Sequence, residues 1–135
     1  PWVRWTTGEH EYTRYGFRNL IVNRAVDIVQ PDVMWCGGLT ELIRIAALAN
    51  AFDIPVVPHG SGAYSYHFGI TQPQAPFAEY INISPSGREI VPVFGALFTD
   101  EALPEAGRIR PPDAPGFGLT LDRDGAALHR PYPPD

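Results

Sequence analysis

The sequence predicts an α/β fold, the C-terminal part of a β/α barrel with about four β/α units, followed by an extended proline-rich tail. Short β-branched runs alternate with helix-length amphipathic patterns through residues 1–84. Ionisable residues recur near the ends of these runs at intervals of roughly one β/α unit. After Ser84, proline, glycine and acidic residues replace the alternation. Strand–helix–strand order with helical crossovers favours parallel strands lying side by side.

Each predicted element follows from a local pattern. The helices show apolar residues at helical spacing, as at Phe17 and Ile21 or at Leu42 and Ala46. The strands are short runs closed by Gly, Pro or Asp, which favour turns. In chain order we predict a strand at 2–7, a helix at 13–25, a strand at 26–29, a helix at 39–52, a strand at 54–58, a short helix at 64–70 and a fourth strand at 77–81.

The pattern divides the chain into two parts. Residues 1–84 form the C-terminal half of a β/α barrel, and residues 85–135 form a tail that holds most of the 15 prolines. Strand-forming residues begin at Trp2 with no methionine before them, so we expect the chain to be a fragment. Half a barrel also exposes two strand edges, which favour pairing with further strands. We therefore expect the tail to wrap over a partner domain.

Composition excludes several classes of partner. The formal charge is −5, from 15 acidic residues and 10 basic residues that are all arginine. This acidic balance, without basic blocks, argues against a nucleic-acid or anionic-membrane partner. Cys36 is the single cysteine, so we expect no internal disulfide and a reducing, cytoplasmic setting. No apolar run approaches the roughly 20 residues that span a bilayer.

Four predicted strands bring ionisable residues toward one rim. Glu9 and His10 follow the first strand, Asp32 the second and His59 the third, while Glu79 lies within the fourth. In β/α barrels, groups at the carboxyl ends of strands meet at one mouth. Each residue also has a plainer explanation. Glu9 would be a surface carboxylate, Asp32 a loop cap, His59 a turn residue and Glu79 an outward-facing strand residue.

These residue types suit proton-transfer chemistry. A carboxylate at position 9 is the kind of ligand that Mg²⁺ prefers. A carboxylate at Asp32 can orient the imidazole of His59 by accepting its N–H. Such a pair can remove a proton beside a carboxylate and return one to a leaving hydroxyl. Glu79 is placed to donate a hydrogen bond to the developing enolate.

Three longer runs, residues 8–17, 30–41 and 56–61, resemble acid-sugar dehydratases of the mandelate racemase group of the enolase superfamily. Residues 65–68 and 115–118 extend the resemblance over nearly the whole chain. The resemblance implies a hydro-lyase in which His59 is the general base, oriented by Asp32. It also implies that Glu9 binds catalytic Mg²⁺ and that Glu79 binds the substrate carboxylate, with His10 reaching the substrate.

The same resemblance implies that parts of the enzyme lie outside this chain. Two further metal carboxylates are expected on earlier strands, and the tail is expected to pack on an N-terminal capping domain. This piece should then be inactive alone, and the whole enzyme is expected to be a homo-oligomer. Two alternatives stay open. One is a dehydratase or epimerase for another acid sugar, and the other is a non-catalytic half-barrel remnant.

Overall fold

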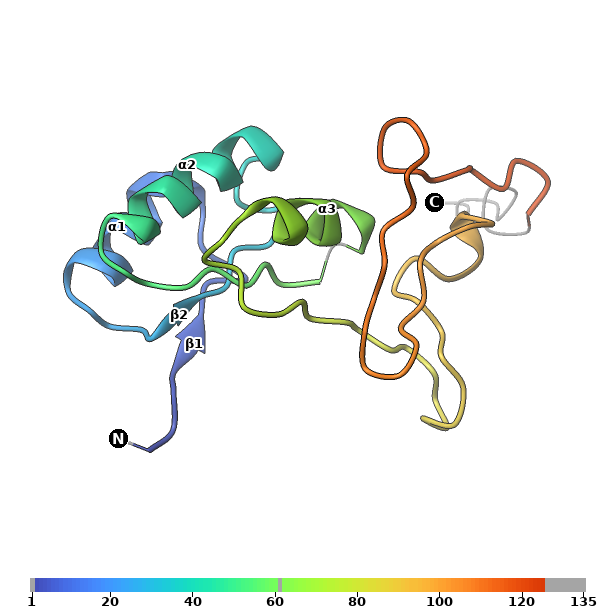
Figure 1. Ribbon diagram of the computed structural model, residues 1–135, viewed down its shortest axis with the longest axis horizontal. Coiled ribbons are helices and arrows are strands. Elements are labelled where there is room, and N and C mark those ends of the chain that lie inside the picture. The colour runs from blue at the N-terminus through green and yellow to red at the C-terminus, as the bar shows by residue number, and fades with distance from the viewer. Residues whose placement is uncertain (1, 61, 126–135) are drawn as a thin grey trace, which may run out of the picture.

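The computed structural model describes residues 2–60 and 62–125 of the chain. Two short strands and two long helices alternate at the start, and a third helix follows before the tail (Figure 1). The elements are β1 (Thr6–Thr7), α1 (Thr13–Val22), β2 (Ile28–Val29), α2 (Leu39–Asn50), α3 (Ala63–Thr71) and a 3-10 helix (Gly95–Leu97). The predicted β/α alternation is therefore confirmed through α3.

Three consecutive segments lie parallel, as predicted. β1 pairs with β2, with Thr6 opposite Ile28. A parallel bridge joins Val29 to Val56, and a second joins Asp32 to His59. Because α1 and α2 carry the chain back between these segments, all three run in one direction and end at one edge. The predicted third strand is present as this bridged segment and not as a full ladder.

The core lies between the two crossover helices and the paired segments. α1 and α2 pack against each other. Phe17 and Ile21 of α1, Leu42 of α2 and Val29 of β2 are fully buried. Burying each such side chain contributes about 1.5 to 3 kcal/mol relative to exposure. The apolar faces read from the sequence are the faces that hold the helices on the sheet.

Both long helices end earlier than predicted, at Val22 and Asn50. Each is followed by a residue with left-handed backbone, Arg24 at φ 50° and Asp53 at φ 58°. After α1, the N–H of Ala25 donates to the carbonyl of Leu20, five residues earlier. After α2, the N–H of Ile54 donates to the carbonyl of Ala49 in the same way. This closure satisfies carbonyls at the helix end, and the periodicity of the apolar residues does not reveal it.

The predicted fourth strand is wrong for this chain. Residues 77–81 have no strand pairing. The preceding segment does touch the third strand, because the N–H of Val56 donates to the carbonyl of Gln74 at 3.1 Å. Pro73 and Pro76 have no N–H to give to a ladder, which weakens pairing along this stretch. The predicted first strand is also shorter than expected, with only Thr6–Thr7 paired.

Residues 85–125 form a looped tail beside α3, on the far side from α1 and α2 (Figure 1). Aromatic side chains attach it. Tyr64 of α3 meets Phe117 edge-on, with ring centroids 4.6 Å apart, and Phe94 lies 6.5 Å away in a similar geometry. The end of the predicted tail, residues 126–135, lies outside the described residues. Its packing on a capping domain stays a prediction.

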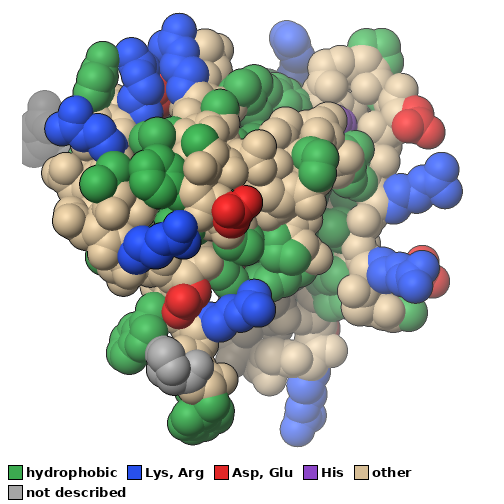
Figure 2. Space-filling view, turned by 60° about the vertical axis from the view of Figure 1, so that its left-hand side comes forward, with side chains coloured by type: hydrophobic (Ala, Val, Ile, Leu, Met, Phe, Trp, Pro, Cys, Tyr) green, Lys and Arg blue, Asp and Glu red, His purple; other side chains and the backbone are tan. Residues whose placement is uncertain are grey.

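The surface keeps several large apolar side chains uncovered. Trp5 is 68% exposed and Phe77 58% exposed. On the face in Figure 2, arginine and acidic side chains lie interspersed with apolar ones.

Within the described part of the chain, no helix combines the length and the apolar character needed to cross a membrane.

Candidate active site

The end of β1 is shaped by a glycine. Gly8 is buried and adopts φ +137°, a backbone conformation that residues with a side chain rarely take. A Cβ atom placed there would lie 2.6 Å from a ring carbon of Phe17 in α1. The chain can therefore turn closely over the buried α1 face and present Glu9 and His10 at the rim.

His59 lies between two carboxylates. Its Nε2 atom is 3.1 Å from Oε2 of Glu9, and its Nδ1 atom is 2.7 Å from Oε2 of Glu79. The imidazole side chain is 26% exposed, so it is sheltered and still reachable from the rim. An imidazole in this position can exchange a proton while a carboxylate holds its other nitrogen.

Glu79 reaches this site although its own segment forms no strand. The backbone N–H of Gly60 donates to Oε2 of Glu79 at 2.7 Å. The side-chain amide of Gln30 donates to Oε1 at 3.0 Å. Both carboxylate oxygens are thus fixed by groups that follow β2 and the third strand.

Asp32 stands at the same edge and caps its own loop. Its Oδ1 atom accepts the backbone N–H of Met34 at 2.7 Å and that of Trp35 at 3.3 Å. The plainer loop-cap role suggested by the sequence is therefore present. The bridge that joins Asp32 to His59 also places the two residues on neighbouring strands. The predicted orientation of the His59 ring by Asp32 stays a prediction.

An aromatic stack forms one side of the site. The rings of His10 and Trp35 have centroids 4.9 Å apart and planes 27° apart. Together with Glu9, Asp32 and His59, these two residues line a cavity of about 190 Å³. Four of the five predicted rim residues therefore share one small cavity, and Glu79 joins them through His59.

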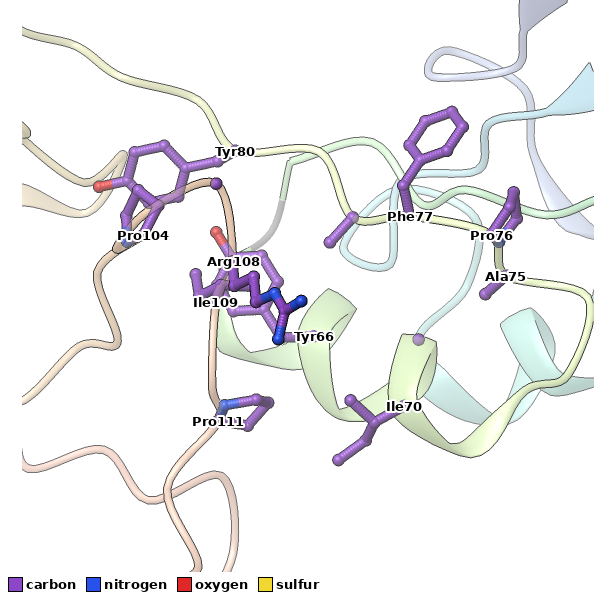
Figure 3. Close-up of a pocket in the computed structure, with 13 residues that line it drawn as sticks. Tyr66, Ile70, Ala75, Pro76, Phe77, Tyr80, Pro104, Arg108, Ile109 and Pro111 are labelled. Atoms are coloured by element: carbon purple, nitrogen blue, oxygen red, sulfur yellow. The ribbon is translucent and has the colours of Figure 1, made fainter.

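A larger cavity of about 680 Å³ lies elsewhere, between α3, the segment around Phe77 and the tail (Figure 3). Tyr66 and Tyr80 line it, and burial raises the pKa of both phenols. Its lining includes neither a carboxylate nor an imidazole. Metal binding favours carboxylate or imidazole ligands, and the raised pKa of both phenols disfavours proton exchange near neutral pH, so the smaller cavity is the candidate site.

The metal-binding capacity of this chain is partial. Glu9 offers carboxylate oxygens from a side chain that is 47% exposed, which suits a hard divalent cation. Across residues 2–60 and 62–125, no three His, Cys, Asp or Glu side chains are grouped to hold a metal ion. Glu9 therefore fits as one ligand, and the remaining ligands of an octahedral ion would come from other groups.

Sequence reasoning missed two residues of the site, Gln30 and Trp35. Gln30 lies directly after β2 and two positions before Asp32, and the period of two in an extended chain is the signal that could have found it. Trp35 follows Asp32 in a loop, where its stacking on His10 depends on how distant segments meet. No local pattern marks such a contact.

Known proteins share this architecture. Residues 3–125 match the family described as enolase C-terminal domain-like. L-rhamnonate dehydratase of Saccharopolyspora erythraea is 55% identical over 130 residues, which cover 96% of this chain and 33% of that protein. The chain spans about a third of the length of this relative.

Solved structures agree with the sequence match. The crystal structure of L-rhamnonate dehydratase from Gibberella zeae is 59% identical, with a TM-score of 0.87 over 94% of this chain and 33% of that one. A structure of rhamnonate dehydratase from the same organism, complexed with Mg, is 55% identical. Its TM-score is 0.80, and the match covers 90% of this chain and 30% of that one. The described residues thus correspond to part of an enolase-superfamily barrel. On the family match over nearly its whole length, this chain belongs to the enolase C-terminal domain-like family.

Proposed function

We propose that this chain supplies the acid–base groups of a Mg²⁺-dependent dehydratase that converts L-rhamnonate to 2-keto-3-deoxy-L-rhamnonate. The observation that carries the proposal is the placement of His59 between Glu9 and Glu79 at the carboxyl ends of parallel segments. Relatives that are 55% and 59% identical are named L-rhamnonate dehydratase, and one related structure is complexed with Mg.

The chain would act as part of a polypeptide of its relatives' length. Glu9 alone makes an incomplete ligand set for Mg²⁺. Apolar side chains near β1 also lack cover, with Trp2 97% and Trp5 68% exposed. Further strands against this edge would bury these indoles and add carboxylates to the same mouth.

The proposed reaction begins with removal of the proton at C2 of the sugar acid. His59 takes this proton at Nε2, the ring nitrogen that faces Glu9 and the cavity. Glu79 donates a hydrogen bond to the substrate carboxylate as that group gains negative charge. His59 then returns its proton to the departing 3-hydroxyl, water leaves, and the resulting enol becomes the 2-keto acid.

Bound Mg²⁺ would stabilise negative charge on the substrate carboxylate, and Glu9 is the residue of this chain that would hold it. His10 would contact the substrate from the side of the cavity, with its ring held against Trp35. Asp32 would orient His59 from the neighbouring strand end, a role that its bridge position supports.

The proposal is tested with the full-length protein, meaning a polypeptide of the relatives' length that contains this chain. Purified protein is incubated with Mg²⁺ and a panel of sugar acids, and 2-keto acid formation is followed. We expect L-rhamnonate to be the preferred substrate and chelation of Mg²⁺ to abolish turnover. Product from another acid sugar but none from L-rhamnonate would move the assignment to that substrate. Inactivity on every acid would favour a non-catalytic domain.

A further inference from the structure

We propose that Gln30 is a positioning residue that fixes the carboxyl group of Glu79, and that Thr6 in turn fixes the amide of Gln30. The proposal rests on the proposed function, because it assigns Glu79 a part in substrate binding. It concerns residues of three separate segments: Thr6 and Gln30 come from the paired β1 and β2 region, and Glu79 comes from a segment that forms no strand.

The contacts form a continuous chain. The hydroxyl of Thr6, in β1, donates to the side-chain carbonyl of Gln30 at 3.3 Å. The amide nitrogen of Gln30, directly after β2, donates to Oε1 of Glu79 at 3.0 Å. The other oxygen of Glu79 receives the Gly60 N–H at 2.7 Å and faces Nδ1 of His59 at 2.7 Å.

The side chain of Glu79 depends on these hydrogen bonds because its backbone is not paired in the sheet. Residues 77–81 form no strand ladder, so neighbouring strands do not fix the position of its side chain. The carboxyl group is held instead by bonds to its two oxygens. Gln30 and Gly60 therefore hold Glu79 in place while Nε2 of His59, on the opposite side of the ring, transfers its proton.

The Gln30 contact also fixes which oxygen of Glu79 faces His59. An amide N–H donates to Oε1, and that oxygen accepts it whether the carboxyl group is ionised or neutral. With Oε1 held in this way, Oε2 is the oxygen that faces the Gly60 N–H and His59. Thr6 fixes this outcome, because its hydroxyl occupies the amide carbonyl and leaves the amide N–H facing Glu79.

The first test is kinetic and uses the full-length protein with Mg²⁺ and L-rhamnonate. Gln30→Met keeps the side-chain length and removes the amide. We expect kcat to fall by about 10 to 100-fold with a much smaller change in KM, since small misplacements of a reacting group cost about this much. Thr6→Val should give the same pattern more weakly. Gln74→Met is the matched control, because it removes an amide that bonds the carbonyl of Ala46, and it should retain wild-type kcat.

A double-mutant cycle shows whether Gln30 acts through Glu79. Gln30→Met should add no further loss of kcat in a Glu79→Gln background, because the group that it positions has already been altered. Additive losses, or equal losses in the Gln30 and Gln74 variants at unchanged melting temperature, would overturn the proposal.

A structural measurement keeps the test independent of the substrate assignment. In the crystal structure of the Gln30→Met variant, the Glu79 carboxyl group should leave the Gly60 N–H or lose its single orientation. An unchanged Glu79 would refute the positioning role even if the wild-type protein dehydrated no sugar acid. Inactivity of the wild-type protein with a displaced Glu79 in the variant would reject the proposed function and keep the positioning role.

Discussion

Nδ1 of His59 lies 2.7 Å from Oε2 of Glu79, a contact between the end of the third strand and a segment that forms no strand. The helix α3 separates the two residues along the chain. Glu79 therefore reaches the site through side-chain bonds rather than through sheet pairing. This arrangement makes the rim depend on a few specific groups, which single substitutions can test.

The turn at Gly8 gives a stability prediction. Gly8→Ala forces a side chain into φ +137° and places its Cβ 2.6 Å from Phe17, so we expect a loss of about 1 to 3 kcal/mol in the free energy of unfolding. Urea denaturation followed by circular dichroism measures this loss. Gly38→Ala is the control, because its φ is +84° but nothing lies within 4 Å. Equal effects of the two substitutions would show that the Phe17 contact contributes nothing.

Glu41 predicts a pH dependence of stability. Hydrogen bonds from Arg14 and Arg44 hold the pKa of this carboxyl group below its usual value. A lowered pKa in the folded state stabilises the protein above about pH 4.5, and this stabilisation is lost as the pH falls further. We expect melting temperatures of the wild-type protein to fall below that pH, and those of Glu41→Gln to fall less steeply.

The contribution of each arginine can be separated. Arg14 bonds both oxygens of Glu41 at 2.8 Å, whereas Arg44 reaches one at 3.2 Å from a side chain that is 57% exposed. Arg14→Met should therefore lower the melting temperature more than Arg44→Met. The reverse order would contradict a larger contribution from the Arg14–Glu41 contact, which joins α1 to α2.

Cys36 should resist modification in the folded protein. Its side chain is fully buried, and burial, followed by the nearby charge of Asp32, raises the thiol pKa to about 11. Because the thiolate is the reactive form, iodoacetamide at pH 8 should leave Cys36 unlabelled until the protein is unfolded. Mass spectrometry of folded and denatured samples checks this expectation. Rapid labelling of Cys36 in the folded state would refute its burial.

The sequence was sufficient for the elements that carry strong periodicity. Phe17 and Leu42 lie on regular apolar faces, so their helices and the parallel order could be predicted. The helix ends depend on the left-handed backbone of Arg24 and Asp53, residue types that do not demand it. The prediction of a fourth strand was wrong because strand pairing depends on a neighbouring strand. The alternation of residue types within 77–81 does not specify such a neighbour.

In the candidate site, too, some features could be predicted from the sequence and others could not. Strand-end spacing located Glu9, Asp32 and His59 at one rim, because parallel strands end at one edge. Their contacts are set in three dimensions. The ring of His59 meets Glu9 and Glu79, while Asp32 caps a loop, and spacing alone cannot distinguish these partners. The predicted homo-oligomer stays a prediction.

The role of His59 is tested by the turnover of His59→Asn in the full-length protein with Mg²⁺ and L-rhamnonate. With the imidazole gone, we expect kcat to fall at least about 100-fold at unchanged melting temperature and Mg²⁺ affinity, the lower range for lost acid–base catalysis. A kcat within a few-fold of wild type would contradict the central role given to His59 between Glu9 and Glu79.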